Sequence, residues 1–159
     1  MLSAMTSSTA ADLAARIRPA LTQLYVMHAR ATGSSDLTSP QVCLLKQLAD
    51  GGEARTSELA RRQNIQMPTA SNAVHQLANR GYLDRVRDSS DRRGVRVHIT
   101  DEGRAALERV TSERNQYFAK MLEVLSEEDL QELEKVSHLV LRLAEKYASL
   151  LEQTPHIEL

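Results

Sequence analysis

Between Tyr82 and Thr100 the spacing of apolar residues changes from a helical period to a period of about two. After the segment SSDRRG, Val95, Val97 and Ile99 alternate with polar residues, as in a strand with one buried face. Serine, aspartate and glycine favour turns, so the sequence predicts a two-stranded ribbon with a charged tip. A short ribbon set among helical segments indicates a mainly α fold with a small β component (α+β).

Helical patterns precede the ribbon. An amphipathic helix is expected from Ala10 to about Ala31, with a kink at Pro19, which removes one backbone hydrogen bond. Ser39 is expected to cap a second helix, because Pro40 then falls in the first turn, where its missing N–H costs nothing. This helix is predicted to run through Leu48 and to end at the segment DGG.

Two short helices joined by a tight turn are expected next. Thr56 is predicted to cap the first of them, SELARRQ. Asn64 follows, and asparagine tolerates the left-handed backbone conformation that such a turn requires. Pro68 starts the second helix, which is predicted to run to Arg80 and to end at Gly81. Together with the ribbon, this pair predicts a winged helix-turn-helix.

The outward side of the second short helix carries hydrogen-bonding groups of the kind that read base edges in a DNA major groove. These candidate DNA-binding residues are Thr69, Ser71, Asn72, His75 and Gln76. Asparagine and glutamine suit adenine, and threonine can touch a thymine methyl group. Met67 cannot cap the helix with its side chain, so either a phosphate or water is expected at the first amides.

The ribbon tip carries Arg92 and Arg93, two guanidinium groups that a narrow tip can insert into a DNA minor groove. Asp91 beside them cannot contact phosphate, so we expect it to hold the tip in shape. The alternative is a solvated tip whose charge prevents pairing with another sheet edge.

Charge is distributed unevenly along the chain. The net charge of the chain is −1, but residues 55–104 contain ten arginines against six acids, a balance of +4. A basic middle with acidic flanks is typical of a protein with one surface that meets phosphate, although random clustering on a solvated surface gives the same count.

Composition excludes several classes of protein. The chain of 159 residues is long enough to bury a core as one domain, and with 3 % aromatic residues that core is expected to be Leu, Val and Ala. The single cysteine cannot form an internal disulfide, no apolar run is long enough to span a membrane, and no secretion signal is evident. We therefore expect a cytoplasmic protein without membrane association.

A long helix and a final helix are expected after the ribbon. Thr100 is predicted to cap the first, with Asp101 and Glu102 at its positive end, and Ser126 is predicted to cap the second. Apolar residues recur in the last helix at alternating steps of three and four, which we call the seam: Leu130, Leu133, Val136, Val140, Leu143, Tyr147 and Leu150. An uncovered seam would be a large apolar stripe, so it is expected to pack against a second chain or against the chain's own first helix.

The order of these elements resembles the MarR family of bacterial winged-helix transcriptional regulators. The motifs that carry the resemblance are LA at Leu59, L..RGYL.R from Leu77, DRRG from Asp91 and IT..G from Ile99. The resemblance implies a single MarR-type domain over residues 1–159, with a winged helix-turn-helix lobe at 36–104 and a helical dimerisation lobe at 10–32 and 105–153.

The resemblance also implies partners and residue roles. It implies an obligate homodimer that reads a pseudo-palindromic double-stranded DNA operator, with Arg93 as the minor-groove arginine and Asp91 as its structural partner. It also implies recognition-helix contacts around Pro68, Thr69, Ser71, Asn72 and His75. Recognition helices one DNA turn apart, about 34 Å, predict an inverted repeat of roughly 16 to 20 base pairs. Repression is the expected default for a compact dimer without an activation segment.

A small phenolic or lipophilic effector is a further implication of the resemblance. Tyr25 and His28 on the first helix and Cys43 on the second are the candidate residues for its pocket. The alternative interpretation takes Cys43 as a small buried hydrophobic residue and His28 as a satisfied core residue.

Two other functions are weighed against DNA binding. An enzyme is not expected, because the histidines lack metal-ligand spacing, no glycine-rich phosphate loop is present, and no metal or cofactor is implied. A winged-helix module that binds protein is the more serious alternative, since the fold alone does not determine function.

Overall fold

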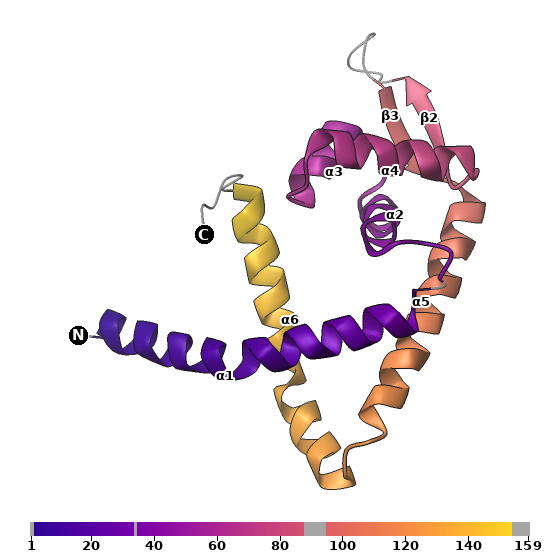
Figure 1. Ribbon diagram of the computed structural model, residues 1–159. Helices are drawn as coiled ribbons and strands as arrows, with labels where there is room; N and C mark the ends of the chain where they lie inside the picture. The colour runs from indigo at the N-terminus through magenta and orange to yellow at the C-terminus, as the bar shows by residue number, and fades with distance from the viewer. Residues whose placement is uncertain (1, 34, 88–94, 154–159) are drawn as a thin grey trace. The chain divides into compact units, whose positions relative to one another are not determined.

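The computed structural model describes residues 2–33, 35–87 and 95–153, and the elements within them are mostly helical, with one small sheet (Figure 1). The chain divides into two compact units, Met1–Ser35 and Asp36–Leu159. The first unit contains helix α1 (Leu2–Ala31), and the second contains the remaining elements. The mainly α fold with a small β component is confirmed.

Helix α1 begins eight residues before the predicted start at Ala10, so that prediction is wrong. The preceding residues are Ser, Thr, Ala, Met and Leu, which show no clear apolar period but also contain no proline or glycine to stop a helix. Pro19 lies inside α1, as expected from the sequence.

Helix α2 (Ser39–Gly51) is capped by Thr38, one residue before the predicted Ser39. The Thr38 Oγ1 accepts a hydrogen bond from the Gln41 amide at 3.4 Å, and the Gln41 Oε1 accepts one from the Thr38 amide at 2.9 Å. This reciprocal capping box satisfies two backbone donors, which is why the helix starts there. The helix ends at Gly51, three residues beyond the predicted Leu48, and Gly52 follows with φ 74°.

Helices α3 (Thr56–Arg62) and α4 (Met67–Asn79) form the predicted helix-turn-helix. The cap of α3 is Arg55, not Thr56, because the Glu58 carboxylate accepts a hydrogen bond from the Arg55 amide at 2.9 Å. Asn64 has φ 50°, which confirms the left-handed turn between the helices. Gly81 has φ 74° just beyond α4.

Three strands form one antiparallel sheet in the order β1-β3-β2. Strands β2 (Leu83–Arg87) and β3 (Val95–Ile99) make the predicted ribbon, with Leu83 opposite Ile99. The third strand, β1 (Ala54–Arg55), pairs with the other edge of β3 and was missed because two residues carry no readable alternation.

Helix α5 (Asp101–Leu122) follows the sheet, and helix α6 (Glu127–Gln153) follows α5. The Thr100 Oγ1 accepts a hydrogen bond from the Gly103 amide at 3.0 Å, and the Ser126 Oγ accepts one from the Asp129 amide at 3.1 Å. Both predicted caps are confirmed. No helix in the described ranges has the length and apolar character needed to cross a membrane.

The hydrophobic core of the second unit lies among α2, α3, α4, the sheet and the first half of α5. It is built mainly from Leu, Val and Ala, as predicted, and its largest fully buried members are Leu37, Leu44, Leu45, Leu48, Leu59, Leu77, Leu83, Val97 and Val110. Burial of each such side chain stabilises the fold by about 1.5–3 kcal/mol.

The start of α5 packs closely against the start of β2. The Thr100 amide donates to the Tyr82 carbonyl at 3.1 Å, and the Thr100 hydroxyl donates to the Gly81 carbonyl at 2.7 Å. A Cβ atom at Gly103 would overlap the Tyr82 carbonyl oxygen and lie 2.9 Å from the Ile99 Cγ1. The glycine of the IT..G motif is therefore required by this close approach.

We predict that Gly103→Ala destabilises the protein by about 1–3 kcal/mol, because the added methyl group forces the Tyr82 carbonyl away from α5. Urea unfolding followed by circular dichroism measures the change. Gly51→Ala is the matched control, since its Cβ would meet only the Arg62 guanidinium at an ordinary 3.5 Å. Equal stability of the two variants would contradict this explanation of Gly103.

Candidate nucleic-acid interface

Helix α4 has one buried side and one exposed polar side. Ala70, Ala73, Val74 and Leu77 are buried against the core. All six predicted recognition residues are exposed on the same helix: Pro68, Thr69, Ser71, Asn72, His75 and Gln76. The helix therefore presents hydrogen-bonding side chains to solvent from a rigid, packed base, which is the arrangement that major-groove reading requires.

The turn between α3 and α4 holds the two helices close together. Ala60 is buried on α3, and its carbonyl accepts a hydrogen bond from the Ile65 amide at 3.0 Å across the turn. A larger side chain at position 60 would have to be accommodated at this buried position beside the turn.

The N-terminus of α4 has no side-chain cap. The capping position is Gln66, one residue before Met67, and the Gln66 side chain makes no capping hydrogen bond. Pro68 lies in the first turn and has no N–H to satisfy. Free amides and the helix dipole both favour an anion at such an end.

Two side chains on the exposed side of α4 already have partners. The Asn79 Nδ2 lies 3.1 Å from the His75 Nε2. The Gln76 Oε1 accepts a hydrogen bond from the Gln41 Nε2 of α2 at 2.9 Å. One atom of each side chain, the His75 Nε2 and the Gln76 Oε1, is therefore engaged within the protein.

The tip of the ribbon, with Asp91, Arg92 and Arg93, lies outside the described residues. The described stem is anchored by Arg96 of β3, whose Nη2 donates to the Glu53 carbonyl at 3.1 Å. The same guanidinium forms ion pairs with the Glu53 and Glu58 carboxylates at 3.6 and 3.7 Å. Arg96 therefore joins the ribbon to the start of α3 and serves the fold.

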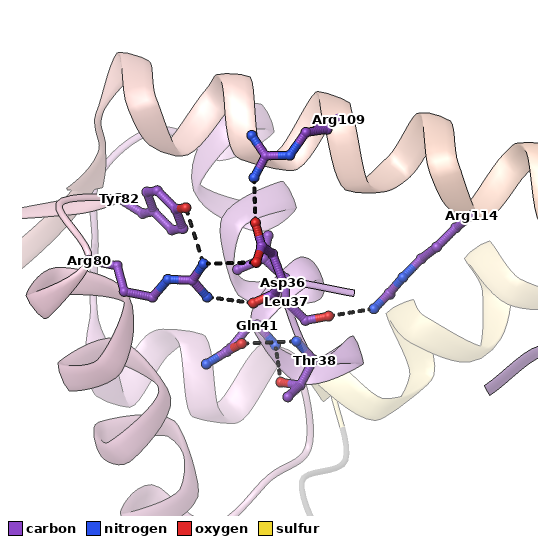
Figure 2. Close-up of polar contacts among 8 residues, drawn as sticks. All are labelled: Asp36, Leu37, Thr38, Gln41, Arg80, Tyr82, Arg109 and Arg114. Atoms are coloured by element: carbon purple, nitrogen blue, oxygen red, sulfur yellow. Dashed lines mark hydrogen bonds and ion pairs between the residues drawn. The ribbon is translucent and has the colours of Figure 1, made fainter. Parts of the chain in front are cut away.

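A polar cluster that the sequence did not predict joins the segment before α2 to α4 and α5. We call Asp36, Arg80, Tyr82 and Arg109 the Asp36 cluster (Figure 2). The Asp36 carboxylate pairs with the Arg109 Nη2 at 2.7 Å and with the Arg80 Nη2 at 3.7 Å, and the Asp36 carbonyl accepts from the Arg80 Nη1. Arg80 also donates to the Tyr82 hydroxyl at 3.2 Å and stacks over its ring at 4.7 Å.

The same segment has a second attachment to α5. The Arg114 Nη2 donates to the Leu37 carbonyl at 2.7 Å, as Figure 2 shows, while the Leu37 side chain is buried in the core. The Tyr82 hydroxyl and the Asp36 carboxylate raise the pKa of Arg109, so this guanidinium stays charged at any physiological pH. Sequence reasoning missed these contacts because Asp36 lies 44 and 73 residues from its two arginine partners, and no local pattern links such positions.

The three residues predicted for an effector pocket differ in exposure and in the unit to which they belong. Tyr25 is exposed and His28 half-buried in the first unit, whereas Cys43 belongs to the second. Cys43 is exposed, so the interpretation of a buried hydrophobic residue is wrong. The buried side of α2 carries Gln41, Leu44, Leu45 and Leu48, and a residue at position 43 points to the other side.

Two grooves in the second unit are lined by other residues. The larger, about 700 Å³, runs between α2 and α5, with the Lys46–Asp50 ion pair at 3.1 Å on the α2 side and Leu107, Thr111 and Asn115 on the α5 side. The smaller, about 470 Å³, is almost entirely apolar and lies between α5 and the seam. Neither groove could be predicted from the sequence, because each combines residues from separate helices.

Comparison with known proteins gives a consistent result. Residues 37–95 match the model of the MarR family. The HTH-type transcriptional repressor MdtR from Bacillus subtilis is 28 % identical over 109 residues, which cover 69 % of this chain and 68 % of that protein.

Solved structures are also similar. The YusO protein from Bacillus subtilis is 25 % identical with a TM-score of 0.64, covering 84 % of this chain and 96 % of that one. The PcaV transcriptional regulator from Streptomyces coelicolor, solved in complex with its natural ligand, is 26 % identical with a TM-score of 0.56, covering 81 % and 89 %.

We predict that Asp36→Asn lowers the urea midpoint of unfolding, because two guanidinium groups then face each other without the carboxylate between them. Adding Arg109→Met to Asp36→Asn should cost less stability than Arg109→Met costs alone, which a double-mutant cycle measures. Asp50→Asn is the control, since it removes one exposed ion pair of α2 and should change little. Additive effects of the two cluster substitutions would show that the cluster does not act as a unit.

Proposed function

We propose that the chain is a MarR-family winged helix-turn-helix protein, a sequence-specific DNA-binding transcriptional regulator that acts as a repressor. The observation that carries the proposal is the exposed polar side of α4, mounted on a buried apolar side. Its place of action is the compartment that holds the chromosome, the bacterial cytoplasm. The relatives with which it compares are transcriptional regulators, and no enzymatic role is proposed.

Each half of the proposed DNA interface has a separate task. Recognition residues of α4, among them Thr69, Asn72 and His75, enter the major groove and contact base edges. Arg92 and Arg93 at the ribbon tip enter the neighbouring minor groove, with Asp91 holding the tip. The uncapped N-terminus of α4 takes a phosphate, which sets the register of the helix on the duplex.

A homodimer is the proposed active form. All seven seam residues of α6 are exposed, up to 69 % for Leu143. The first unit also exposes apolar residues of α1 at helical spacing: Leu13, Ile17, Leu21 and Leu24. Proteins in water rarely leave apolar stripes of this size uncovered, and a second copy of the chain offers the matching stripes. The dimerisation lobe is thus proposed at residues 10–32 and 105–153, beside a DNA-binding lobe at 36–104.

The proposed operator follows from the two-fold symmetry. Two copies of α4 one DNA turn apart require an inverted repeat of roughly 16 to 20 base pairs. Release from this operator by a small phenolic or lipophilic ligand is proposed for the chain, supported by its likeness to PcaV, which was solved with its natural ligand. The groove between α2 and α5 is large enough for such a molecule and is the first place to look for it.

We predict that affinity for an operator duplex falls steeply with salt, because arginines that neutralise phosphates release counterions. Arg93→Ala should weaken binding to all sequences and reduce the salt slope. Asn72→Ala should instead cost about 1–3 kcal/mol at one or two base positions. Fluorescence anisotropy with an operator and with point-substituted duplexes measures both.

A salt-independent interaction, or equal behaviour of the two variants, would count against these assignments. Flat salt dependence together with capture of a defined protein would favour the protein-binding module instead.

We also predict that Leu143→Arg prevents dimerisation, because a charge in the centre of the seam cannot be buried without a partner. Sedimentation velocity should show two associated chains for the natural sequence and one for the variant. Glu145→Arg places the same residue on the opposite side of α6 and should leave the dimer intact. A single chain for the natural sequence would contradict the dimer.

A further inference from the structure

Gln41 is a buried polar residue in the core of the second unit, with 6 % of its surface exposed. Each end of its side-chain amide has a partner. The Oε1 accepts a hydrogen bond from the Thr38 amide at 2.9 Å (Figure 2), and the Nε2 donates one to the Gln76 Oε1 at 2.9 Å. A side chain on α2 is thus in direct contact with one of the residues proposed to meet DNA.

The backbone amide of Thr38 determines which atom is the donor and which the acceptor in both of these hydrogen bonds. A backbone N–H can only donate, so the atom of Gln41 facing the Thr38 amide must be the oxygen. The nitrogen of Gln41 therefore faces Gln76, and because this nitrogen can only donate, the atom of Gln76 that meets it must be the carbonyl oxygen. The Nε2 of Gln76, with its two hydrogens, then points away from α2.

We infer that Gln41 is a positioning residue that determines specificity, because it holds Gln76 with the amide nitrogen presented to DNA as a hydrogen-bond donor. The inference rests on the proposed function, since it concerns how the recognition helix reads its site. It goes further by assigning a polarity to one contact. The matching group on DNA is a hydrogen-bond acceptor.

The orientation of the Gln76 amide determines which base it can recognise by hydrogen bonding. The bidentate contact of glutamine with adenine needs the Oε1 to accept from N6 and the Nε2 to donate to N7. With the Oε1 directed at Gln41, only the donor half is available. The major-groove edge of guanine offers two acceptors, N7 and O6, and no donor, so guanine fits the fixed orientation.

The Gln41→Glu substitution reverses the orientation without removing the helix cap. A carboxylate still accepts from the Thr38 amide, because threonine followed three residues later by glutamate is itself a capping box. The second carboxylate oxygen can only accept, so Gln76 must rotate to donate its Nε2 to it. The Oε1 of Gln76 then faces DNA as an acceptor, which suits the exocyclic amino group of adenine or cytosine.

The test is selection of binding sites from randomised duplexes by the full-length dimer. Gln76→Ala first identifies the base pair that this residue contacts, as the position where preference is lost. At that pair the natural sequence should prefer guanine by about five- to a hundredfold, and Gln41→Glu should shift the preference to adenine or cytosine. Gln41→Met, which lacks hydrogen-bonding groups but keeps the length, should leave the pair without preference and the other pairs unchanged.

A double-mutant cycle separates this role from charge and stability. If Gln41 acts through Gln76, the effect of Gln41→Glu must disappear when Gln76 is alanine. Uniform loss of affinity for all sequences that also disappears in the Gln76→Ala background identifies a phosphate oxygen as the acceptor and overturns the assignment of specificity to Gln41.

An effect of Gln41→Glu that persists without Gln76, or no effect at all, overturns the inference. Absence of sequence preference in the natural protein is a different result, because it rejects the proposed function itself.

Discussion

The segment from Asp36 to Gln41 is the structural constraint on which the position of the recognition helix depends. It contacts α4 at Gln76 and at Arg80, one helical turn apart, through the side chains of Gln41 and Asp36. It contacts α5 through the Asp36 carboxylate and the Leu37 carbonyl, which bind Arg109 and Arg114. A short segment between two helices, bound to each at two points, leaves α4 little freedom to rotate about its own axis.

The two kinds of interaction in this region have different consequences. Burial of side chains such as Leu37, Leu59 and Leu77 supplies most of the free energy that holds the second unit together. The ion pairs of Asp36 are exposed to water and stabilise far less. These ion pairs restrict the orientation of the side chains, because a guanidinium can donate hydrogen bonds to a carboxylate in only a few orientations. Leucine side chains, in contrast, can pack in many orientations. The core therefore holds α4 in place and determines which of its sides is exposed, and the polar contacts orient side chains on that exposed side.

Whether a feature of this structure could be predicted depends on how far apart in the sequence the interacting residues lie. Asn64, Thr100 and Ser126 were identified correctly, since a turn or a cap depends on residues within four positions. Caps at Thr38 and Arg55 were missed by one residue, because the Ser39 side chain is as suited to capping as that of Thr38, and the Thr56 side chain is better suited than that of Arg55. In each case the cap is the residue whose backbone amide donates a hydrogen bond to the side chain three residues later, Gln41 or Glu58. The local sequence pattern does not show which of two neighbouring residues makes this bond.

The polar contacts of the candidate interface could not be predicted from the sequence, because their partners are far apart in the chain. Gln41 and Gln76 lie 35 residues apart, and each looks like an ordinary polar residue on an amphipathic helix. The sequence showed that Gln76 is exposed, which follows from helical periodicity. It did not show which of its two amide atoms is exposed, because that depends on a backbone amide at Thr38 and on the packing of α2 against α4.

The burial of Gln41 explains why the Gln76 amide keeps one orientation. A glutamine as deeply buried as Gln41 must have its amide satisfied, or each unpaired atom costs about 1–3 kcal/mol. The Thr38 amide and the Gln76 side-chain carbonyl satisfy it together. Rotation of the Gln41 amide would break both bonds, and rotation of the Gln76 amide would leave the buried Gln41 Nε2 without its acceptor. Gln76 is therefore held in one of two otherwise similar orientations by a penalty that arises in the core. The orientation of an exposed residue is set here by the hydrogen-bonding needs of a buried one.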